Sequence, residues 1–171
     1  MKKLIILSVF AIVVAGSIFA QEKAANARSN WASGDLYFPP GGGLKFERML
    51  NGRLSLGANG YSIFVIDSSN VFTEMGFDAF ARFYPWGKTF FAGTGLGYHA
   101  IEDRYAKING AAITPEIGWK IDVGNVGKFF IQPGIKAPII FGVRNDKDTG
   151  ESKFVVETAV MLPHFGMGFA F

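Results

Sequence analysis

Apolar and polar residues alternate with a period of two along most of the chain after residue 30. In segment 110–123, Ile113, Ile117 and Ile121 share one parity, while Glu116 and Lys120 share the other. The segments 53–64, 71–84, 89–101 and 129–141 repeat this alternation. A period of two indicates β-strands, because successive side chains of a strand point to opposite faces. No apolar stretch after residue 30 reaches the roughly 18 residues that a membrane-spanning helix needs.

Turn-forming residues separate the alternating segments and set the expected number of strands. Short connections at 51–52, 85–88 and 124–128 alternate with longer polar ones at 67–70, 102–107 and 144–152. The pattern predicts an all-β, antiparallel, up-and-down fold of eight strands. These strands are expected at 31–38, 44–50, 53–65, 72–84, 89–101, 109–123, 129–142 and 153–171. Pro115, Pro133 and Pro138 lie inside them, and since proline removes a ladder hydrogen bond, we expect local bulges there.

Alternation alone does not say whether the apolar face points inward or outward. A soluble sandwich or carrier buries its apolar face, whereas a transmembrane β-barrel turns it toward lipid. The bulky residues lie opposite small ones, such as Gly93, Gly95 and Gly97, which suits a narrow interior. Aromatic residues near segment ends suggest the interfacial girdle of such a barrel. These are Tyr37, Tyr84, Trp86, Tyr98 and Trp119. We therefore predict a transmembrane β-barrel with its apolar face outward.

Charged residues on the polar parity are expected to lie inside this barrel. Five acidic and five basic positions share that parity, and buried charges must be paired because an isolated one costs several kcal/mol. The predicted interior charges are Lys45, Glu47, Arg53, Glu74, Asp78, Arg82, Glu116, Lys120, Asp122 and Lys136. A chance balance on a water-exposed surface is the alternative explanation. Paired charges in a narrow interior would plug the barrel.

The first twenty residues have the layout of a secretory signal peptide. Lys2 and Lys3 precede an apolar run that ends in small residues, with cleavage expected after Ala20. An uncleaved membrane anchor is the alternative. Residues 21–30 then form a polar spacer, and 31–171 form the barrel domain. Without the two leader lysines, 15 basic side chains face 14 acidic ones, so the charge gives no reason to expect nucleic-acid binding.

Several stretches resemble a known group of proteins. "ARFYPWGKTFFAGTGLGYH", "ITPEIGWKID", "FFIQPGIK" and the final "PHFGMGFAF" are similar to small outer-membrane β-barrel proteins of spirochaetes and other diderm bacteria. The wider group is that of the eight-stranded OmpA/OmpX-like barrels. This resemblance implies an outer-membrane location and an assembly signal at the carboxyl end. The residues that match the signal are Phe165, Met167, Phe169 and Phe171.

The chemistry-bearing residues give little reason to expect catalysis. His99 precedes Glu102 and Asp103, but no nucleophile lies at a spacing typical of a catalytic triad. Asp146, Asp148 and Glu151 lack the ligand spacing of a calcium loop, and the chain has no cysteine. We expect no enzyme activity, no cofactor and no metal.

The predicted function is that of a monomeric outer-membrane protein with a structural or surface-interaction role. The expected partners are outer-membrane lipid, the barrel-assembly machinery and an extracellular ligand of the loops. Two alternatives stay open: a narrow outer-membrane channel, and a soluble exported carrier resembling a lipocalin.

Overall fold

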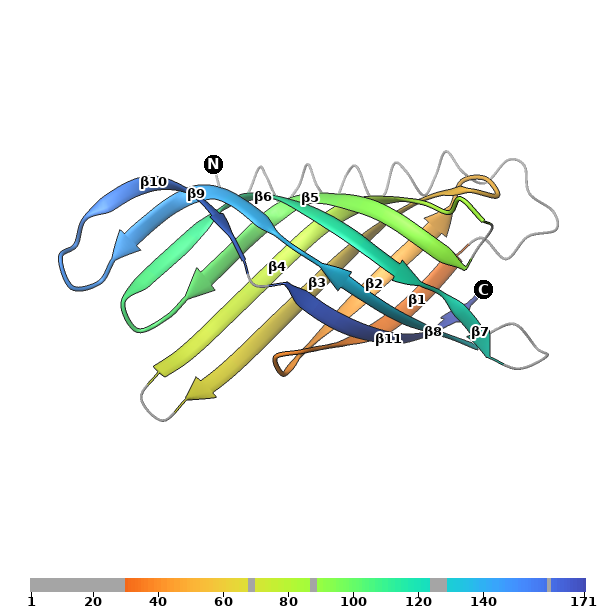
Figure 1. The fold of residues 1–171 in the computed structure, drawn as a ribbon, viewed down its shortest axis with the longest axis horizontal. Coiled ribbons are helices and arrows are strands. Elements are labelled where there is room, and N and C mark those ends of the chain that lie inside the picture. Colours follow the sequence, from red (N-terminus) through yellow and green to blue (C-terminus); the bar gives the residue numbers. More distant parts are fainter. Residues whose placement is uncertain (1–29, 68–69, 87–88, 124–128, 160) are drawn as a thin grey trace.

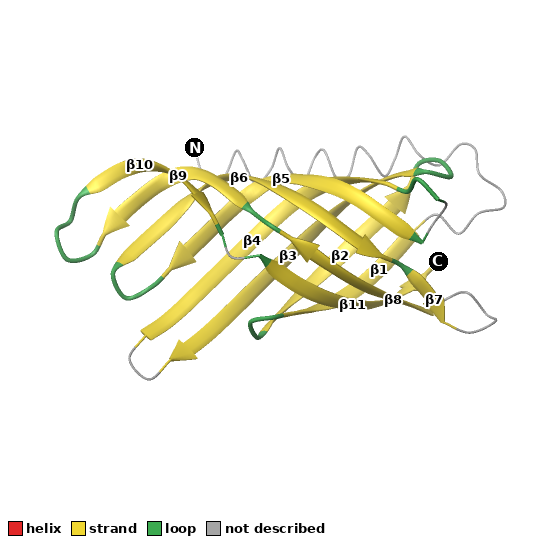
Figure 2. Cartoon of the chain, in the orientation of Figure 1, coloured by secondary structure: helices red, strands yellow, loops and turns green. Residues whose placement is uncertain are grey.

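The computed structural model describes residues 30–67, 70–86, 89–123, 129–159 and 161–171. These residues form strands and loops only (Figure 2), and all strand pairs are antiparallel. The predicted signal peptide at 1–20 and all of the predicted spacer except Asn30 lie outside the described residues. The strands are β1 (Asn30–Tyr37), β2 (Gly41–Met49), β3 (Leu54–Asp67), β4 (Asn70–Phe83), β5 (Phe90–Glu102), β6 (Ala106–Trp119), β7 (Ile121–Val123), β8 (Phe129–Lys136), β9 (Ile139–Asp146), β10 (Ser152–Thr158) and β11 (Leu162–Ala170).

Eight of these strands close into a hydrogen-bonded ring, which confirms the predicted antiparallel, all-β fold of eight neighbouring strands. Each strand from β1 to β6 pairs with the next, β6 pairs with β8, β8 with β11, and β11 with β1. The weakly patterned first strand was predicted at 31–38, and the structure has it at Asn30–Tyr37. The ladder between β1 and β11 closes the ring and runs from Trp31 opposite Ala170 to Tyr37 opposite His164. The ring is not evenly arranged around one axis.

The last three predicted strands are each divided in two. β6 and β7, β8 and β9, and β10 and β11 are the halves of these strands. Along β6 and β7 the pairing keeps one constant register, from Ile113 opposite Ile139 to Ile121 opposite Ile131. The expected bulge at Pro115 is therefore wrong, because no extra residue enters the ladder. Pro115 instead accepts a hydrogen bond from the Ala137 N–H at 3.0 Å and, lacking its own N–H, returns none.

The third divided strand does contain a register change. Thr158 lies opposite Ile139, but Leu162 lies opposite Lys136, so one extra residue enters this strand between the two pairs. The change reverses the parity of the two faces. As a result Glu157 shares the face of Val155, which packs on a buried cluster inside the molecule. This corrects the predicted continuous strand 153–171, in which Glu157 would share the face of Phe165 and Phe171.

The two ends of the molecule differ (Figure 1). One end carries the short connections and the carboxyl terminus, and the other carries the loops between β5 and β6 and between β9 and β10. At the loop end β9 and β10 extend the sheet from β6, and in the described part of the chain β10 has β9 as its single strand partner. In the described residues, no helix has the length and apolar character to cross a bilayer.

Apolar side chains fill both ends of the interior, and charged ones lie between them. At the short-turn end the buried residues are Trp31, Met49, Tyr84, Phe91, Phe130 and Ala170. At the loop end they are Ile101, Ile108, Ala112, Ile140 and Ala159, with Tyr37, Tyr61, Ile63 and Leu162 beside the ring closure. Charged groups in this interior are thus shielded from water at both ends.

Candidate functional site

Arg82 of β4 lies at the centre of the main ionic network inside the ring. Its Nη1 is 2.7 Å from Glu47 Oε2, and its Nη2 is 2.7 Å from Glu116 Oε1. The guanidinium also lies 4.5 Å from the ring centre of Phe80 and 4.1 Å from that of Phe91. The Arg82 side chain is 0% exposed, and its two carboxylate partners come from β2 and β6. These contacts cross-link three strands of the ring.

Both carboxylates around Arg82 have further partners. Tyr84 donates a hydrogen bond to Glu47 Oε1 at 2.6 Å, and the Ser55 hydroxyl donates to the same oxygen. Lys45 Nζ is 3.7 Å from Glu116 Oε1 and 2.7 Å from Asp35 Oδ2. The network therefore extends from β2 and β4 to β1, which closes the ring.

A second polar cluster surrounds His99 of β5. The Tyr61 hydroxyl donates to Glu74 Oε1 at 2.6 Å, so its oxygen is left to accept from His99 Nδ1 at 3.0 Å. On the other side of the imidazole, His99 Nε2 donates to Asp78 Oδ1 at 2.8 Å, and the Thr114 hydroxyl donates to the same oxygen at 3.0 Å. Both imidazole nitrogens thus have a polar partner inside the molecule, and these contacts fix the orientation of the imidazole.

Two buried lysines lie against aromatic rings. Lys136 Nζ is 3.4 Å from the ring centre of Tyr61 and 4.6 Å from that of Tyr37. Lys120 Nζ is 2.6 Å from the ring centre of Trp31. An ammonium above an aromatic face is attracted by the negative face of the ring, and more strongly where water is excluded. The aromatic residues at the two ends of the interior therefore help to hold the buried cations.

The structure brings together eight of the ten charged residues predicted to lie inside. The buried ones are Lys45, Glu47, Glu74, Asp78, Arg82, Glu116, Lys120 and Lys136. Arg53 and Asp122 differ from the prediction, because both are exposed. Arg53 belongs to the turn before β3, and Asp122 belongs to the three-residue β7, whose side chains are all exposed. Parity alone could not locate either residue, since neither lies in a strand of the closed ring.

Sequence reasoning missed three members of the buried network, Asp35, His99 and His164, whose Nε2 lies 3.1 Å from Glu116 Oε1. Asp35 lies in the strand with the weakest pattern, although Trp31, Ser33, Asp35 and Tyr37 do share one parity and are all buried. His99 had been considered only beside Glu102 and Asp103, whereas its side chain contacts Asp78 and Tyr61. Among the described residues, five buried carboxylates face four buried lysine and arginine side chains, and the two buried histidines lie beside carboxylates as well.

The aromatic residues assigned to a girdle divide between the two faces. Tyr37 and Tyr84 are buried inside, which corrects their assignment to the outer surface. Trp86, Tyr98 and Trp119 are exposed. At the short-turn end, Trp86, Phe90 and Trp119 form a contiguous outer row, with ring centres 5.3 Å and 5.5 Å apart. Phe129 and Phe169 add a further outer pair at 5.4 Å.

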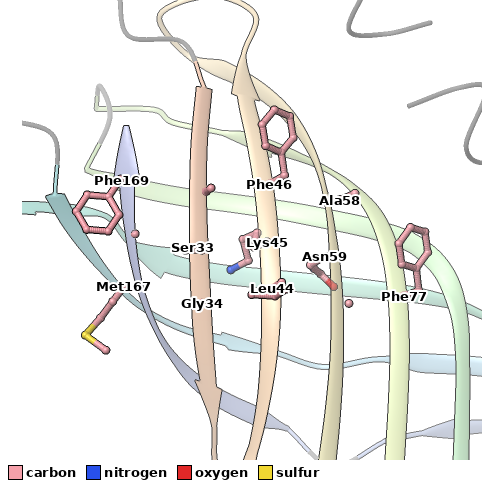
Figure 3. Close-up of a pocket in the computed structure, with 13 residues that line it drawn as sticks. Ser33, Gly34, Leu44, Lys45, Phe46, Ala58, Asn59, Phe77, Met167 and Phe169 are labelled. Atoms are coloured by element: carbon pink, nitrogen blue, oxygen red, sulfur yellow. The ribbon is translucent and has the colours of Figure 1, made fainter. Parts of the chain in front are cut away.

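The outer face of the ring is strongly apolar. Large apolar side chains are more than a third exposed on every strand that forms the ring. A shallow groove of about 560 Å³ crosses β1 to β4 and β11, and Figure 3 shows Phe46, Phe77, Met167 and Phe169 around it. Lys45 and Asn59 also line the groove, but their side chains are buried. The groove therefore offers almost no polar group that could orient a substrate.

The carboxyl-terminal residues predicted as an assembly signal share this outer face. Phe165, Met167, Phe169 and Phe171 are all exposed, with fractions between 40% and 63%. Their neighbours on the other parity, from Leu162 to Ala170, are buried. The final residue is held in register, because the backbone N–H of Phe171 donates to the Asn30 oxygen at 2.9 Å.

A polar surface lies at the loop end. Lys147 Nζ contacts Glu102 Oε1 at 2.8 Å and donates to the Asp103 backbone oxygen at 2.7 Å, joining the β9–β10 loop to the β5–β6 loop. These residues, with Val71, Thr73 and Arg104, line an open hollow of about 420 Å³. A hydrogen bond from the Lys147 N–H to the Tyr105 oxygen at 2.8 Å also links the two loops.

The acidic loop considered for calcium uses its first carboxylate within the turn. Asp146 Oδ1 accepts hydrogen bonds from the backbone N–H groups of Thr149 and Asp148, each at 2.9 Å. These bonds favour the charged carboxylate and lower the pKa of Asp146 below its ordinary value. Within the described residues no group of three or more histidine, aspartate or glutamate side chains could hold a metal ion.

The comparisons with known proteins do not assign the chain to a family. No protein-family model matches the sequence, and no curated protein is significantly similar to it.

Proposed function

We propose that the chain is a small outer-membrane β-barrel protein with a structural or surface-interaction role, and that paired charges plug its interior. The observation that carries this proposal is the inverted distribution of polarity. Glu116 and Lys136 are nearly inaccessible to water, while their neighbours Ile117 and Ile135, on the opposite face of the same strands, are 49% and 44% exposed. A soluble protein gains stability by the opposite arrangement.

Three further features support a membrane location. A closed ring leaves few unpaired backbone groups, as a strand-built membrane protein requires. The outer aromatic row of Trp86, Phe90 and Trp119 lies at one end of the ring, where a girdle at the membrane interface is expected. Short connections at that end and longer polar loops at the other match the usual division between inner turns and outer loops.

The loop surface is the part of the molecule that is suited to contacting a partner. Lys147, Glu102 and Arg104 place charges of both signs around one open hollow. The interior, by contrast, is crossed by Arg82 and its two carboxylates and is closed by apolar residues at both ends. These contacts favour a plugged barrel over the narrow channel. A lipocalin-like carrier would need an apolar inner cavity, whereas the centre of this interior is ionic.

Fractionation and gel mobility test the location directly. We expect the protein to stay in the outer-membrane fraction after a carbonate wash, and to migrate faster on gels when it is not heated. Recovery in the periplasmic fraction would contradict the proposal. In planar bilayers the plugged barrel should show no conductance steps, and regular steps would favour the channel instead.

A substitution on the outer face tests the orientation of the strands. Ile117→Arg should destabilise the protein in lipid by about 2–4 kcal/mol if Ile117 lies near the middle of the bilayer. The loop substitution Thr149→Arg serves as the control and should have little effect. Urea unfolding in lipid vesicles measures both. A neutral result for Ile117→Arg and for Ile135→Arg would mean that this face does not contact lipid.

A further inference from the structure

One strand edge at the loop end has no partner in the described part of the chain. β10 pairs with β9 alone, and its opposite edge lies outside the closed ring. The N–H of Ala159 donates to Pro138, and Glu151 accepts from Asp146, so odd-numbered residues of β10 bond to β9. Even-numbered residues therefore direct their N–H and C=O groups to the open edge. Such an edge is a template for another strand in water, and it is costlier still in lipid.

The side chains of β10 are arranged symmetrically about Val155. Lys153 and Glu157 flank it at equal distances on the inner face, and Phe154 and Val156 flank it on the outer face. Phe154 is 70% exposed and Val156 is 58% exposed. Lys153 is exposed as well, and Glu157 is partly exposed beside Arg144, at 3.1 Å. Charges on an edge strand normally discourage pairing with other chains.

We propose that the open edge of β10 pairs with the same edge of a second copy of this chain, antiparallel and centred on Val155. In this arrangement Lys153 of each copy lies opposite Glu157 of the other, and Phe154 lies opposite Val156. The pairing is independent of the membrane location proposed above, because it requires only the edge and its charges.

The hydrogen-bond parity agrees with this register. The backbone N–H and C=O groups of Phe154 and Val156 face the open edge. Phe154 of one copy and Val156 of the other therefore become hydrogen-bonded pairs. Val155 then faces its own copy across the two-fold axis in a non-hydrogen-bonded pair, where the Cα atoms are about 4.5 Å apart. Lys153 and Glu157 form pairs of the same close type, in which opposite charges attract most effectively.

The neighbouring registers are less favourable. A shift by two residues in one direction places Glu157 opposite Glu151 of the other copy, so that like charges meet. A shift in the other direction places Lys153 opposite Ala159 and Glu157 opposite Val155. Only the register centred on Val155 pairs both charges in both copies. Lys153 and Glu157, which discourage pairing with other strands, therefore favour pairing with a second copy of the same strand.

Charge reversal provides the main test, with the full chain purified in detergent and its mass measured by analytical ultracentrifugation. Lys153→Glu alone puts glutamates opposite each other, and Glu157→Lys alone puts lysines opposite each other. Each single variant should dimerise at least tenfold more weakly than the wild type. An equimolar mixture of the two variants recreates both opposite-charge pairs and should dimerise as the wild type does.

Recovery of dimerisation in the mixture cannot come from a general loss of stability in the variants. One variant can restore dimerisation of the other only if their β10 edges pair. The double variant K153E/E157K also restores both pairs within a single sequence and should be dimeric. Circular dichroism checks that every variant keeps its β-structure. A monomeric wild type, or a mixture that associates no better than each variant alone, would overturn the proposal.

A disulfide tests the position of the axis, since the natural chain has no cysteine. Val155→Cys should form a covalent dimer on mild oxidation, because Cα atoms about 4.5 Å apart can be bridged. Thr149→Cys, in the loop beside the same strand, is the matched control for random collisions. Cross-linking of the Thr149 variant to the same extent as the Val155 variant would contradict pairing centred on Val155.

Discussion

The buried guanidinium of Arg82 allows a quantitative test of how the interior is held together. We consider Arg82→Met, which keeps much of the side-chain length and removes the charge. The substitution leaves Glu47 and Glu116 without the donor that now lies 2.7 Å from each. Removing one partner of a buried ion pair lowers the free energy of unfolding by about 3–5 kcal/mol, because the remaining charge stays in a poorly solvated site. Here two carboxylates lose their common partner, so we expect the upper part of that range.

The assay is urea unfolding of the detergent-solubilised protein, followed by tryptophan fluorescence. Trp31 suits this purpose because it is buried against Tyr84 and Phe130 inside the ring. Lys107→Met is the control, since Lys107 lies 3.6 Å from Glu102 in an exposed pair that contributes about 0–1 kcal/mol. Adding Glu116→Gln to the Arg82 variant removes one uncompensated charge and should recover part of the loss. An Arg82 variant within about 1 kcal/mol of the wild type would refute a central role for this network.

A glycine substitution tests the packing of the interior, and a deletion tests the carboxyl-terminal signal. Gly97→Ala should destabilise the protein by about 1–3 kcal/mol in the same assay, because its new Cβ would overlap the Phe77 carbonyl oxygen and lie 2.6 Å from Asp78 Oδ1. Gly34→Ala, on the outer face with its nearest neighbour 4.0 Å away, should change stability by less than about 0.5 kcal/mol; equal losses would mean that the two faces are equally crowded. Deletion of Phe171 should lower the amount of assembled protein in the outer membrane relative to the wild type, measured by gel mobility without heating. Unchanged assembly would show that the terminal residue carries no signal.

The alternation of the sequence predicts the strands well because it records which face each residue occupies. In β6 every second residue from Ala112 to Gly118 is buried, as parity requires. The same rule identifies Lys45, Glu47 and Arg82 as inward residues before any contact is known. It succeeds because a closed antiparallel ring has two distinct faces, and a strand cannot shift by one residue without exchanging them.

Parity does not reveal where a strand leaves the ring. Asp122 follows the alternation of β6, yet it lies beyond Lys120, in a short segment that, among the described strands, pairs only with β8. Arg53 likewise follows the parity of β3 but belongs to the turn that precedes it. The limit of burial is set by how far the neighbouring strands extend, and this depends on residues far away in the sequence.

Parity also cannot identify the partner of an inward residue. His99 and Asp78 are 21 positions apart, and their contact arises because β4 and β5 pair with Gly76 opposite His99. The missing side chain at Gly76 leaves room for the imidazole, since a Cβ there would lie 2.8 Å from His99 Cε1. Inward glycines therefore do more than narrow the ring: they make space for large polar side chains from the adjacent strand.

The register change between β10 and β11 connects these observations to the open edge. Without the extra residue, Lys153, Val155 and Glu157 would share the outer face with Phe165 and Met167. Because the parity reverses, the two charges turn inward and Phe154 and Val156 turn outward. The ladder between β11 and β1 stops where β1 ends, at Tyr37, and in the described part of the chain β10 continues beyond it without a second neighbour. The inserted residue thus sets the face on which this open edge strand carries the charges that a second copy can complement.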